Sequence, residues 1–272
     1  MIGPQRGRPL LAMALIAAVL LSLRGLGGPG PLPPGPVDPL DRYRPVPGGP
    51  GADFAPPPQT RRIRLGDGTE LDEGVVAEVL RREGLAQRWS AFTWWRANEN
   101  VATVAPGLDG RHHFANAYLV GYVPYPGVEP WVPLASLARN KRYRYDHEQY
   151  PGMPELWQTS REAFHFPEGD CEDHAIALAD WLIGLGLEAR VVIGRARGEG
   201  HAWVVLLQGG QTYLLEATHK RPGRALPLAA QFPDYHPEVM FDREHYWVNT
   251  GSAVTTDYTG LRWQLRSRFR RG

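Results

Sequence analysis

The sequence predicts an α+β fold in which one helix packs against antiparallel strands. Residues 171–186 read CEDHAIALADWLIGLG and carry an apolar face at helical spacing. The residues of that face are Ala175, Leu178, Ala179 and Leu182. Three strand-like runs rich in valine and leucine follow, separated by the turns RARGEG and QGGQ. These runs cover residues 188–194, 201–207 and 212–218. Short turns make neighbouring strands antiparallel, so the predicted order is helix and then three adjacent strands.

Further elements are predicted on both sides of this unit. Residues 72–89 (DEGVVAEVLRREGLAQRW) predict a helix with Asp72 as its N-cap, because an aspartate there accepts a hydrogen bond from a first-turn N–H. Residues 116–123 (NAYLVGYV) predict a strand, and residues 134–143 (LASLARNKRY) predict a short helix. Two segments of the tail can each add a strand, namely 245–251 (HYWVNTG) and 262–269 (RWQLRSRF).

The N-terminus carries an export pattern. Arg6 and Arg8 precede the uncharged apolar run of residues 10–23, whose length fits the hydrophobic region of a signal peptide and falls short of the roughly 20 residues that span a bilayer. Residues 1–28 are therefore interpreted as a signal peptide or an N-terminal membrane anchor, with residues 10–26 as the membrane tether. Either interpretation predicts a periplasmic or other extracytoplasmic location, with anchoring to the inner membrane as the second option.

Composition divides the rest of the chain. Twelve of the 26 prolines lie between residues 29 and 58. Such a composition cannot bury a core, so residues 29–60 are predicted to be a linker. Residues 61–272 are long enough for one domain with a sizeable core, of which about residues 140–220 form the centre.

Charge and cysteine content exclude several classes of function. The net charge is +1, so we expect no nucleic-acid partner, and the arginine-rich tail is interpreted as a solvated end. A single cysteine excludes an intramolecular disulfide and leaves the thiol free for chemistry. With one cysteine and no HExxH motif, a zinc site is not expected.

Cys171 is the candidate nucleophile. It opens the predicted helix, where unpaired first-turn N–H groups and the helix dipole favour a thiolate. Glu172 and Asp173 oppose this by raising the thiol pKa, so a cation must lie nearby. His201 is the candidate base, because it opens a predicted strand next to the helix. Glu216 is an acid in an apolar strand, and a catalytic histidine needs such an acceptor to fix its tautomer.

Each candidate also has a plain structural interpretation. A lone cysteine is more often a small buried apolar residue than a nucleophile. His201 can satisfy a hydrogen bond at a strand end, and Glu216 can be an edge-strand charge that faces water. His174 is a rival base, three residues beyond the cysteine, although helix geometry directs it along the helix flank.

Two motifs and a strand acid, in this order and spacing, resemble the bacterial transglutaminase-like cysteine peptidases. The motifs are GDCED at 169–173 and GHAWV at 200–204, and the segment WQTSREAFHFPEGDCED at 157–173 is also similar to the family. The resemblance covers about residues 140–220 and implies a papain-like α+β core with a triad ordered cysteine, histidine, acid. The matching residues are Cys171, His201 and Glu216. The chain departs from the family by carrying glutamate where aspartate is usual.

The same resemblance implies a calcium site, because some members bind the ion through the acids on either side of the nucleophile. The matching residues are Asp170 and Glu172, and no cofactor is otherwise required. The alternative is that Asp170 caps the helix while Glu172 complements its dipole. The predicted oxyanion site uses the backbone N–H of Cys171 and a second donor from Gln158 or an upstream tryptophan.

The sequence therefore predicts an exported cysteine peptidase or amidase that acts on peptide or side-chain amides of a protein or peptide substrate. Cys171 attacks the carbonyl, His201 transfers the proton, Glu216 orients His201, and water releases the acyl group from the thioester. One alternative is a transglutaminase, in which an amine replaces water. The other is a catalytically inactive fold that binds peptide or wall components through the same groove.

Overall fold

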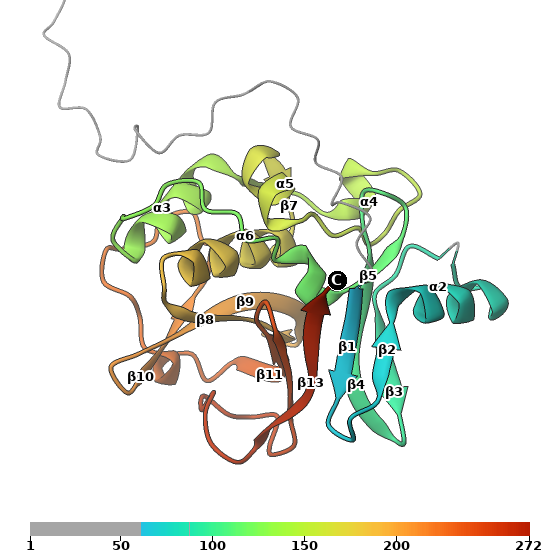
Figure 1. Ribbon diagram of the computed structural model, residues 1–272. Coiled ribbons are helices and arrows are strands. Elements are labelled where there is room, and N and C mark those ends of the chain that lie inside the picture. The colour runs from blue at the N-terminus through green and yellow to red at the C-terminus, as the bar shows by residue number, and fades with distance from the viewer. Residues whose placement is uncertain (1–60, 87) are drawn as a thin grey trace, which may run out of the picture. The chain divides into compact units, whose positions relative to one another are not determined.

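A computed structural model describes residues 61–86 and 88–272 as one α+β body (Figure 1). The helices are α2 (Glu73–Arg82), η2 (Ala115–Tyr118), α3 (Trp131–Asn140), α4 (Asp146–Gln149), α5 (Ser160–His165), α6 (Cys171–Gly184) and η3 (Ala229–Gln231), where η marks a 3-10 helix. The strands are β1 (Arg61–Leu65), β2 (Glu70–Asp72), β3 (Phe92–Arg96), β4 (Glu99–Pro106), β5 (His112–Phe114), β6 (Arg142–Tyr143), β7 (Glu168–Gly169), β8 (Glu188–Ala196), β9 (Glu199–Gln208), β10 (Gln211–Leu215), β11 (Tyr235–Phe241), β12 (His245–Asn249) and β13 (Trp263–Arg271).

A large antiparallel sheet forms the centre of the fold. Its strand order is β10, β9, β8, β11, β12, β13, β1, β2, and every neighbouring pair is antiparallel. Helix α6 packs across β8 and β9, as Figure 1 shows. The predicted fold class, with the cysteine helix on an antiparallel sheet, is confirmed.

Helix α6 is buried on nearly every side. Its predicted face is inside, since Ala175 is 2% exposed and Leu178 is fully buried, but Ile176 and Trp181 on other faces are fully buried as well. The reason is that α5 and α3 cover the side of α6 that does not face the sheet. A helix enclosed in this way holds its first residue, Cys171, in a fixed position relative to β8 and β9.

Several other predicted elements are confirmed. Helix α2 begins after Asp72, whose carboxylate accepts a 2.7 Å hydrogen bond from the N–H of Gly74. It ends at Arg82, seven residues before the predicted end, and Gly84 follows with a positive φ of 68°. Helix α3 covers the helix predicted from Leu134, beginning three residues earlier. Both tail segments form strands, β12 and β13. Most of the terminal arginines are therefore part of the central sheet, and Arg268, Arg270 and Arg271 are exposed to solvent.

The strand predicted at residues 116–123 is wrong. This segment begins within η2, and Gly121 adopts a positive φ of 84°. The carboxylate of Asp180 on α6 accepts hydrogen bonds of 2.8 Å from the N–H groups of both Gly121 and Tyr122. A buried acid thus satisfies the backbone groups that a neighbouring strand would otherwise pair, and a short apolar run cannot reveal this.

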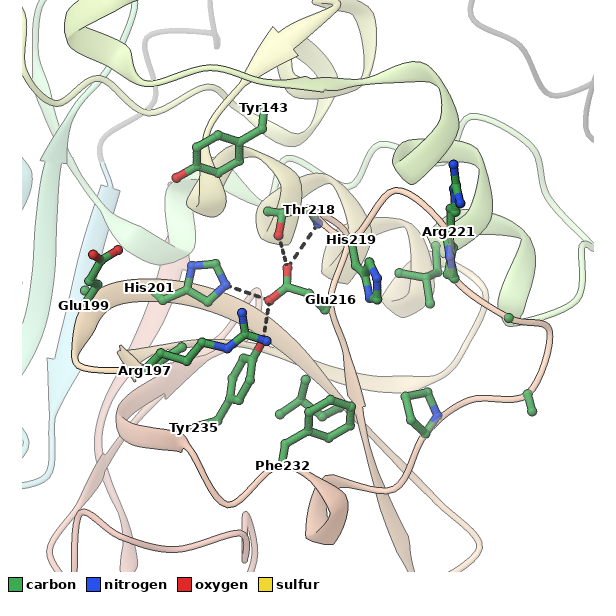
Figure 2. A pocket seen from close by; sticks show the side chains of 18 of the residues that line it. Tyr143, Arg197, Glu199, His201, Glu216, Thr218, His219, Arg221, Phe232 and Tyr235 are labelled. Carbon is green, nitrogen blue, oxygen red and sulfur yellow. Dashed lines mark hydrogen bonds and ion pairs between the residues drawn. The ribbon is translucent and has the colours of Figure 1, made fainter.

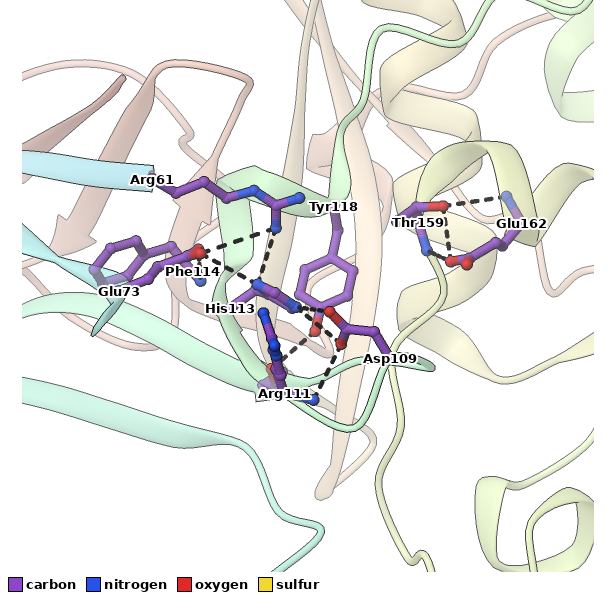
Figure 3. A network of polar contacts seen from close by, with 10 residues as sticks. Arg61, Glu73, Asp109, Arg111, His113, Phe114, Tyr118, Thr159 and Glu162 are labelled. Carbon is purple, nitrogen blue, oxygen red and sulfur yellow. Dashed lines mark hydrogen bonds and ion pairs between the residues drawn. The ribbon is translucent and has the colours of Figure 1, made fainter. Parts of the chain in front are cut away.

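A network of charged side chains ties the N-terminal elements to the rest of the body (Figure 3). His113 of β5 lies 3.2 Å from the carboxylate of Glu73 at the start of α2 and 3.0 Å from that of Asp109. Burial disfavours a charged imidazole, but the hydrogen bonds to Asp109 and Glu73 outweigh it and raise the pKa of His113. Arg61 of β1 lies 2.9 Å from the same ring.

The predictions for residues 1–28 and 29–60 lie outside the described residues. Within the described part of the chain, no helix has the length and apolar character needed to cross a bilayer. The boundary at residue 61 and the single domain from 61 to 272 stay predictions.

Candidate active site

Cys171 and His201 line one cavity of about 330 Å³, called here the cysteine cavity. Cys171 is the first residue of α6, and His201 lies on β9, the strand against which α6 packs. The backbone N–H of Ala202, next to His201 on β9, interacts with the cysteine sulfur and stabilises its thiolate form. The structure thus brings the predicted nucleophile and the predicted base to the same place.

Glu216 completes this arrangement on the far side of the imidazole. Its carboxylate lies 2.6 Å from Nε2 of His201, and both side chains are largely buried, with 17% of His201 and 14% of Glu216 exposed. Because Nε2 is committed to Glu216, Nδ1 is the ring nitrogen left to exchange a proton within the cysteine cavity. His201 thus lies between Glu216 and the cysteine cavity, which is the place of the base in a triad.

The Glu216 carboxylate is held by several donors (Figure 2). Oε1 accepts hydrogen bonds from the N–H and hydroxyl of Thr218 at 3.1 and 2.6 Å, and the Tyr235 hydroxyl donates to Oε2 at 3.1 Å. Burial alone would raise the pKa of Glu216, but the bonds from His201 and Thr218 outweigh it, so this pKa lies below its usual value. Glu216 is therefore a fixed anion rather than an edge-strand charge, and it lies one residue beyond the end of β10.

The thiol itself rests in its neutral form. Burial, together with the charge of Asp170, raises the pKa of Cys171 to about 12. Its S–H donates to the carboxylate of Glu172 at 3.3 Å. The acids that raise this pKa are Asp170 and Glu155, whereas the hydrogen bond with Glu172 lowers it, so Glu172 does not play the part expected from the sequence. The thiolate still requires a positive charge close by.

His174 does not face the cysteine cavity. Its Nδ1 lies 2.6 Å from the carbonyl oxygen of Asp170, and Nε2 lies 3.1 Å from the ammonium group of Lys220. Burial and the charges of Lys141 and Lys220 lower the pKa of His174 to about 3. This imidazole is neutral and fully occupied, so it holds the start of α6 in place and offers no alternative base.

Gln158, the predicted oxyanion donor, is fully buried and does not line the cysteine cavity. Its side-chain carbonyl accepts a 3.0 Å hydrogen bond from the buried ammonium group of Lys141. Its amide group donates to Tyr150 at 3.3 Å and to the carbonyl of Glu168 at 3.2 Å. Trp157 does line the cavity, with its indole N–H donating to Glu155 at 2.7 Å. In this arrangement Gln158 secures Lys141 and is not directed at a substrate.

Four buried carboxylates gather beside Cys171 and form what we call the carboxylate cluster. They belong to Asp146, Asp170, Glu172 and Asp173, and one ligand oxygen from each lies within 4.8 Å of the others. Each of these residues has a buried oxygen that makes no hydrogen bond with any described residue. Asp170 stands at the N-cap position of α6 but makes no side-chain cap bond, so capping does not account for it.

The oxygen-rich cluster fits a hard cation. Calcium takes six to eight oxygen ligands, and four carboxylates with free oxygens supply a large part of that set. The backbone at Gly169 passes close to the side chains of Asp173 and Lys141. A Cβ on Gly169 would lie 2.5 Å from an oxygen of Asp173 and 2.6 Å from Lys141. The glycine of the GDC motif is therefore needed to let β7 pass between these two side chains.

Asp146 and Asp173 are the site residues that sequence reasoning missed as ligands. Asp173 has a signal, because it is a third acid directly after the Asp170 and Glu172 pair. Asp146 has none, since it lies 25 positions before Cys171 on the short helix α4. Its other oxygen accepts a 2.5 Å hydrogen bond from the N–H of Leu156, which holds it toward the cluster.

A second and larger cavity, called here the histidine cavity, adjoins the first and holds about 710 Å³. Tyr143, Tyr145, Gly200 and His201 line both cavities, so they meet at the imidazole. Figure 2 shows Tyr143 and Tyr235 on opposite sides of the His201 and Glu216 pair. Basic side chains line the histidine cavity: Arg197, His219 and Arg221. Acidic ones line the cysteine cavity: Asp146, Glu155, Asp170 and Glu172.

Comparison with known proteins places the site inside a matched region. Residues 155–270 match the family model described as the CEP76 peptidase-like domain. The chain is 47% identical to the human Centrosomal protein of 76 kDa over 55 residues, which is 20% of this chain and 8% of that protein. It is 30% identical to the human Protein CC2D2B over 114 residues, 39% of this chain and 8% of that protein. The chain thus spans a small part of the length of these relatives.

Solved structures are similar at a lower level. Calcium-bound LapG of Legionella pneumophila has a TM-score of 0.37 and 17% identity, covering 51% of this chain and 76% of that chain. EGTA-treated LapG has a TM-score of 0.36 and 18% identity, covering 49% of this chain and 72% of that chain. The predicted resemblance to a bacterial family is thus refined, because the sequence matches lie with a CEP76 peptidase-like domain.

The predicted location is wrong. A periplasmic or extracytoplasmic protein, anchored to the inner membrane, was expected from the export pattern of the N-terminus. The curated relatives of mouse and human are instead named as centrosomal proteins, which belong to eukaryotic cells without a periplasm. The apolar run of residues 10–23 shares the composition of a signal peptide, and composition alone does not establish export.

Proposed function

We propose that this domain is a cysteine peptidase or amidase that cleaves peptide or side-chain amides through a thioester. The observation that carries the proposal is that His201, which contacts Glu216 at 2.6 Å, lines the same cavity as Cys171. Three residue types needed for thiol catalysis are thus ordered as nucleophile, base and orienting acid. The match of residues 155–270 to a peptidase-like domain supports the same class of function.

The residues act in the following order. Nδ1 of His201 takes the thiol proton as the sulfur of Cys171 attacks the amide carbonyl carbon, and the carbonyl oxygen becomes an oxyanion. The N–H of Cys171, unpaired at the start of α6, donates to that oxyanion. His201 then gives its proton to the departing amine, leaving a thioester. Water attacks the thioester, loses a proton to His201 and releases the acid with the free thiol.

Glu216 serves this sequence through His201 alone. By accepting from Nε2 it fixes the tautomer with Nδ1 free, and its negative charge stabilises the imidazolium that forms when the thiol ionises. Thr218 and Tyr235 keep the carboxylate in place, so the extra methylene of glutamate relative to aspartate is accommodated without loss of the contact. The two adjoining cavities leave room for a peptide on both sides of His201.

We infer that the carboxylate cluster holds a calcium ion. Its ligands would be Asp146, Asp170, Glu172 and Asp173, because one oxygen of each lies within 4.8 Å of the others. When bound, the ion would supply positive charge beside Cys171 that offsets the surrounding acids.

A second candidate function is a catalytically inactive module that binds peptide in the same groove. The observation that favours it is the resting thiol, because burial and the charge of Asp170 raise its pKa to about 12 and make it a weak nucleophile. In that case His201 and Glu216 serve packing and peptide recognition only.

The decisive experiment has two reactions, each run with calcium and with chelator. In the first, the purified chain is incubated with a glutamine-containing protein and a labelled amine together. In the second, it is incubated with a thiol-directed electrophile. Mass spectrometry that locates the electrophile on Cys171, together with cleavage that Cys171→Ala abolishes, supports the peptidase. Amine incorporation without chain cleavage replaces hydrolysis by acyl transfer. Alkylation no faster than that of a free thiol under both conditions, with neither product formed, supports the binding module.

A further inference from the structure

Four arginines meet on the outer face of the sheet where its first and last strands pair. Strands β1 and β13 are antiparallel neighbours, with Arg62 opposite Arg270 and Arg64 opposite Arg268. Figure 1 shows the two strands side by side although they come from distant parts of the sequence. Intervening residues such as Ile63 and Phe269 are buried, so alternation directs the four arginines outward, and all four are exposed.

Like charges in directly opposed positions destabilise a sheet. Arg62 is partly balanced by Glu70, with 3.3 Å between their charged groups. Within the described part of the chain, Arg64, Arg268 and Arg270 have no ion pair. The positive charge on this face is therefore largely uncompensated by the protein and attracts an anion.

The face borders a cavity of about 610 Å³ at the end of β13, which we call the arginine groove. Arg268 and Arg270 line it from the strand, Arg243 and Arg271 line it from its edges, and Glu244 is the one acid on its described walls. A concave site of this size suits a small ligand more than an extended surface does.

Two of these arginines are already fixed by the protein. Arg243 donates from Nε to the Asp180 carboxylate at 2.5 Å and from Nη2 to the Asp180 carbonyl at 2.8 Å. Arg271 donates from Nη2 to the carbonyl of Leu119. A guanidinium has five N–H donors, so each keeps further donors for a ligand while its orientation is set in advance. Arg268 and Arg270 are free to close on the ligand from the other side.

We propose that the arginine groove binds a small soluble molecule that carries two or more phosphate groups. Guanidinium groups pair with phosphate oxygens in bidentate fashion, and several phosphates neutralise several arginines at once. A membrane headgroup carries the same chemistry, but surface-bound proteins add exposed apolar side chains beside the basic ones. The large apolar residue on the groove wall, Phe269, is only 5% exposed, which favours a free ligand.

The test titrates the purified chain with inositol hexakisphosphate and with inorganic pyrophosphate by calorimetry at physiological ionic strength. Arg268→Ala/Arg270→Ala should weaken binding about tenfold or more, because two charge-assisted contacts are lost from exposed positions. Arg268→Lys/Arg270→Lys keeps the charge and should recover only part of the affinity, since an ammonium group cannot bind in bidentate fashion. Full affinity in the lysine variant would contradict recognition by guanidinium geometry.

The matched control is Arg81→Ala/Arg82→Ala, which removes the same charge from the exposed end of α2. Unchanged binding by this variant supports a local site, whereas equal weakening by both double alanine variants would reduce the effect to net charge and overturn the proposal. Binding to vesicles that contain phosphatidylinositol bisphosphate, without binding to either free probe, would also overturn it. Cys171→Ala should bind the probes normally, so failure of the peptidase proposal leaves this result unaffected.

Discussion

Glu216 and the carboxylate cluster are buried acids beside two adjoining cavities, and they differ in how their oxygens are satisfied. Glu216 accepts hydrogen bonds from His201, Thr218 and Tyr235, and both of its oxygens are used. In the cluster, each of the four acids leaves one buried oxygen without a described partner.

This difference has opposite electrostatic consequences. Hydrogen bonds and the imidazole lower the pKa of Glu216 despite its burial. Burial and neighbouring acids raise the pKa of Asp146 to about 9, and they raise those of the other cluster acids as well. Burial alone therefore does not define the role of an acid: a satisfied carboxylate is suited to orient a base, as we propose for Glu216, whereas a group of unsatisfied ones is suited to a cation.

The largest expected effect comes from removing the negative charge of Glu216, the acid whose two oxygens both accept hydrogen bonds. Glu216→Gln should lower kcat/KM for amide cleavage by about 10³- to 10⁴-fold, because a glutamine amide donates to Nε2 of His201 and moves the imidazole proton to Nδ1. With Nδ1 protonated, the ring cannot accept the thiol proton. Steady-state kinetics measures the loss, and the alkylation rate of Cys171 should fall with it.

Glu78→Gln is the matched control for this substitution. Glu78 is an exposed acid on α2 that lines neither cavity, and it forms no ion pair with a described residue. Its change should leave kcat/KM within about twofold. A Glu216→Gln variant that keeps near-normal activity would remove Glu216 from the triad.

An intermediate effect is expected from adding calcium, which we infer binds the carboxylate cluster. Calcium at about 100 times its Kd should raise Tm by about 5 to 10 °C, because an ion that binds only the folded state stabilises it by mass action. Differential scanning calorimetry with calcium, magnesium and EGTA measures this shift.

Two variants separate the acids on the two sides of the groove. Asp146→Asn/Glu172→Gln should abolish the calcium shift, whereas Glu216→Gln should retain it, since Glu216 is not part of the cluster. A Tm that calcium leaves unchanged in the wild-type chain would argue against a metal site.

The smallest expected effect is a pH dependence of stability in the absence of metal. The folded pKa of Asp146 is raised to about 9, so the folded protein holds a proton that the unfolded chain loses near the ordinary carboxyl pKa. Its contribution to stability is complete below pH about 4 and is lost as pH rises toward 9. Tm in EGTA should therefore fall between pH 5 and 9.

The same pH series compares the two kinds of acid. Asp146→Asn should flatten the slope between pH 5 and 9. Glu216→Gln should not, because the lowered pKa of Glu216 affects stability only as pH falls below the ordinary carboxyl value. Equal slopes in the wild-type chain and Asp146→Asn would contradict the raised pKa.

Sequence reasoning predicted the cysteine helix, its three following strands and the proximity of Cys171, His201 and Glu216. These predictions succeeded because local spacing and short turns fix neighbouring elements. The strand expected at 116–123 failed because the buried carboxylate of Asp180 binds its backbone N–H groups. Asp170 was open to a capping interpretation that its side chain does not support, since it makes no cap hydrogen bond.

By itself, the sequence determined which residues form helix α6 and strands β8 to β10, and with them the candidates for nucleophile, base and acid. Only the tertiary structure decided that Asp146 joins three acids at the start of α6, that Lys141 contacts Gln158, and that arginines of β1 and β13 face each other. The physical reason is the distance along the chain over which each kind of interaction acts. Periodicity and capping act within a few residues, whereas these groups meet through packing and strand pairing between segments that sequence spacing does not relate.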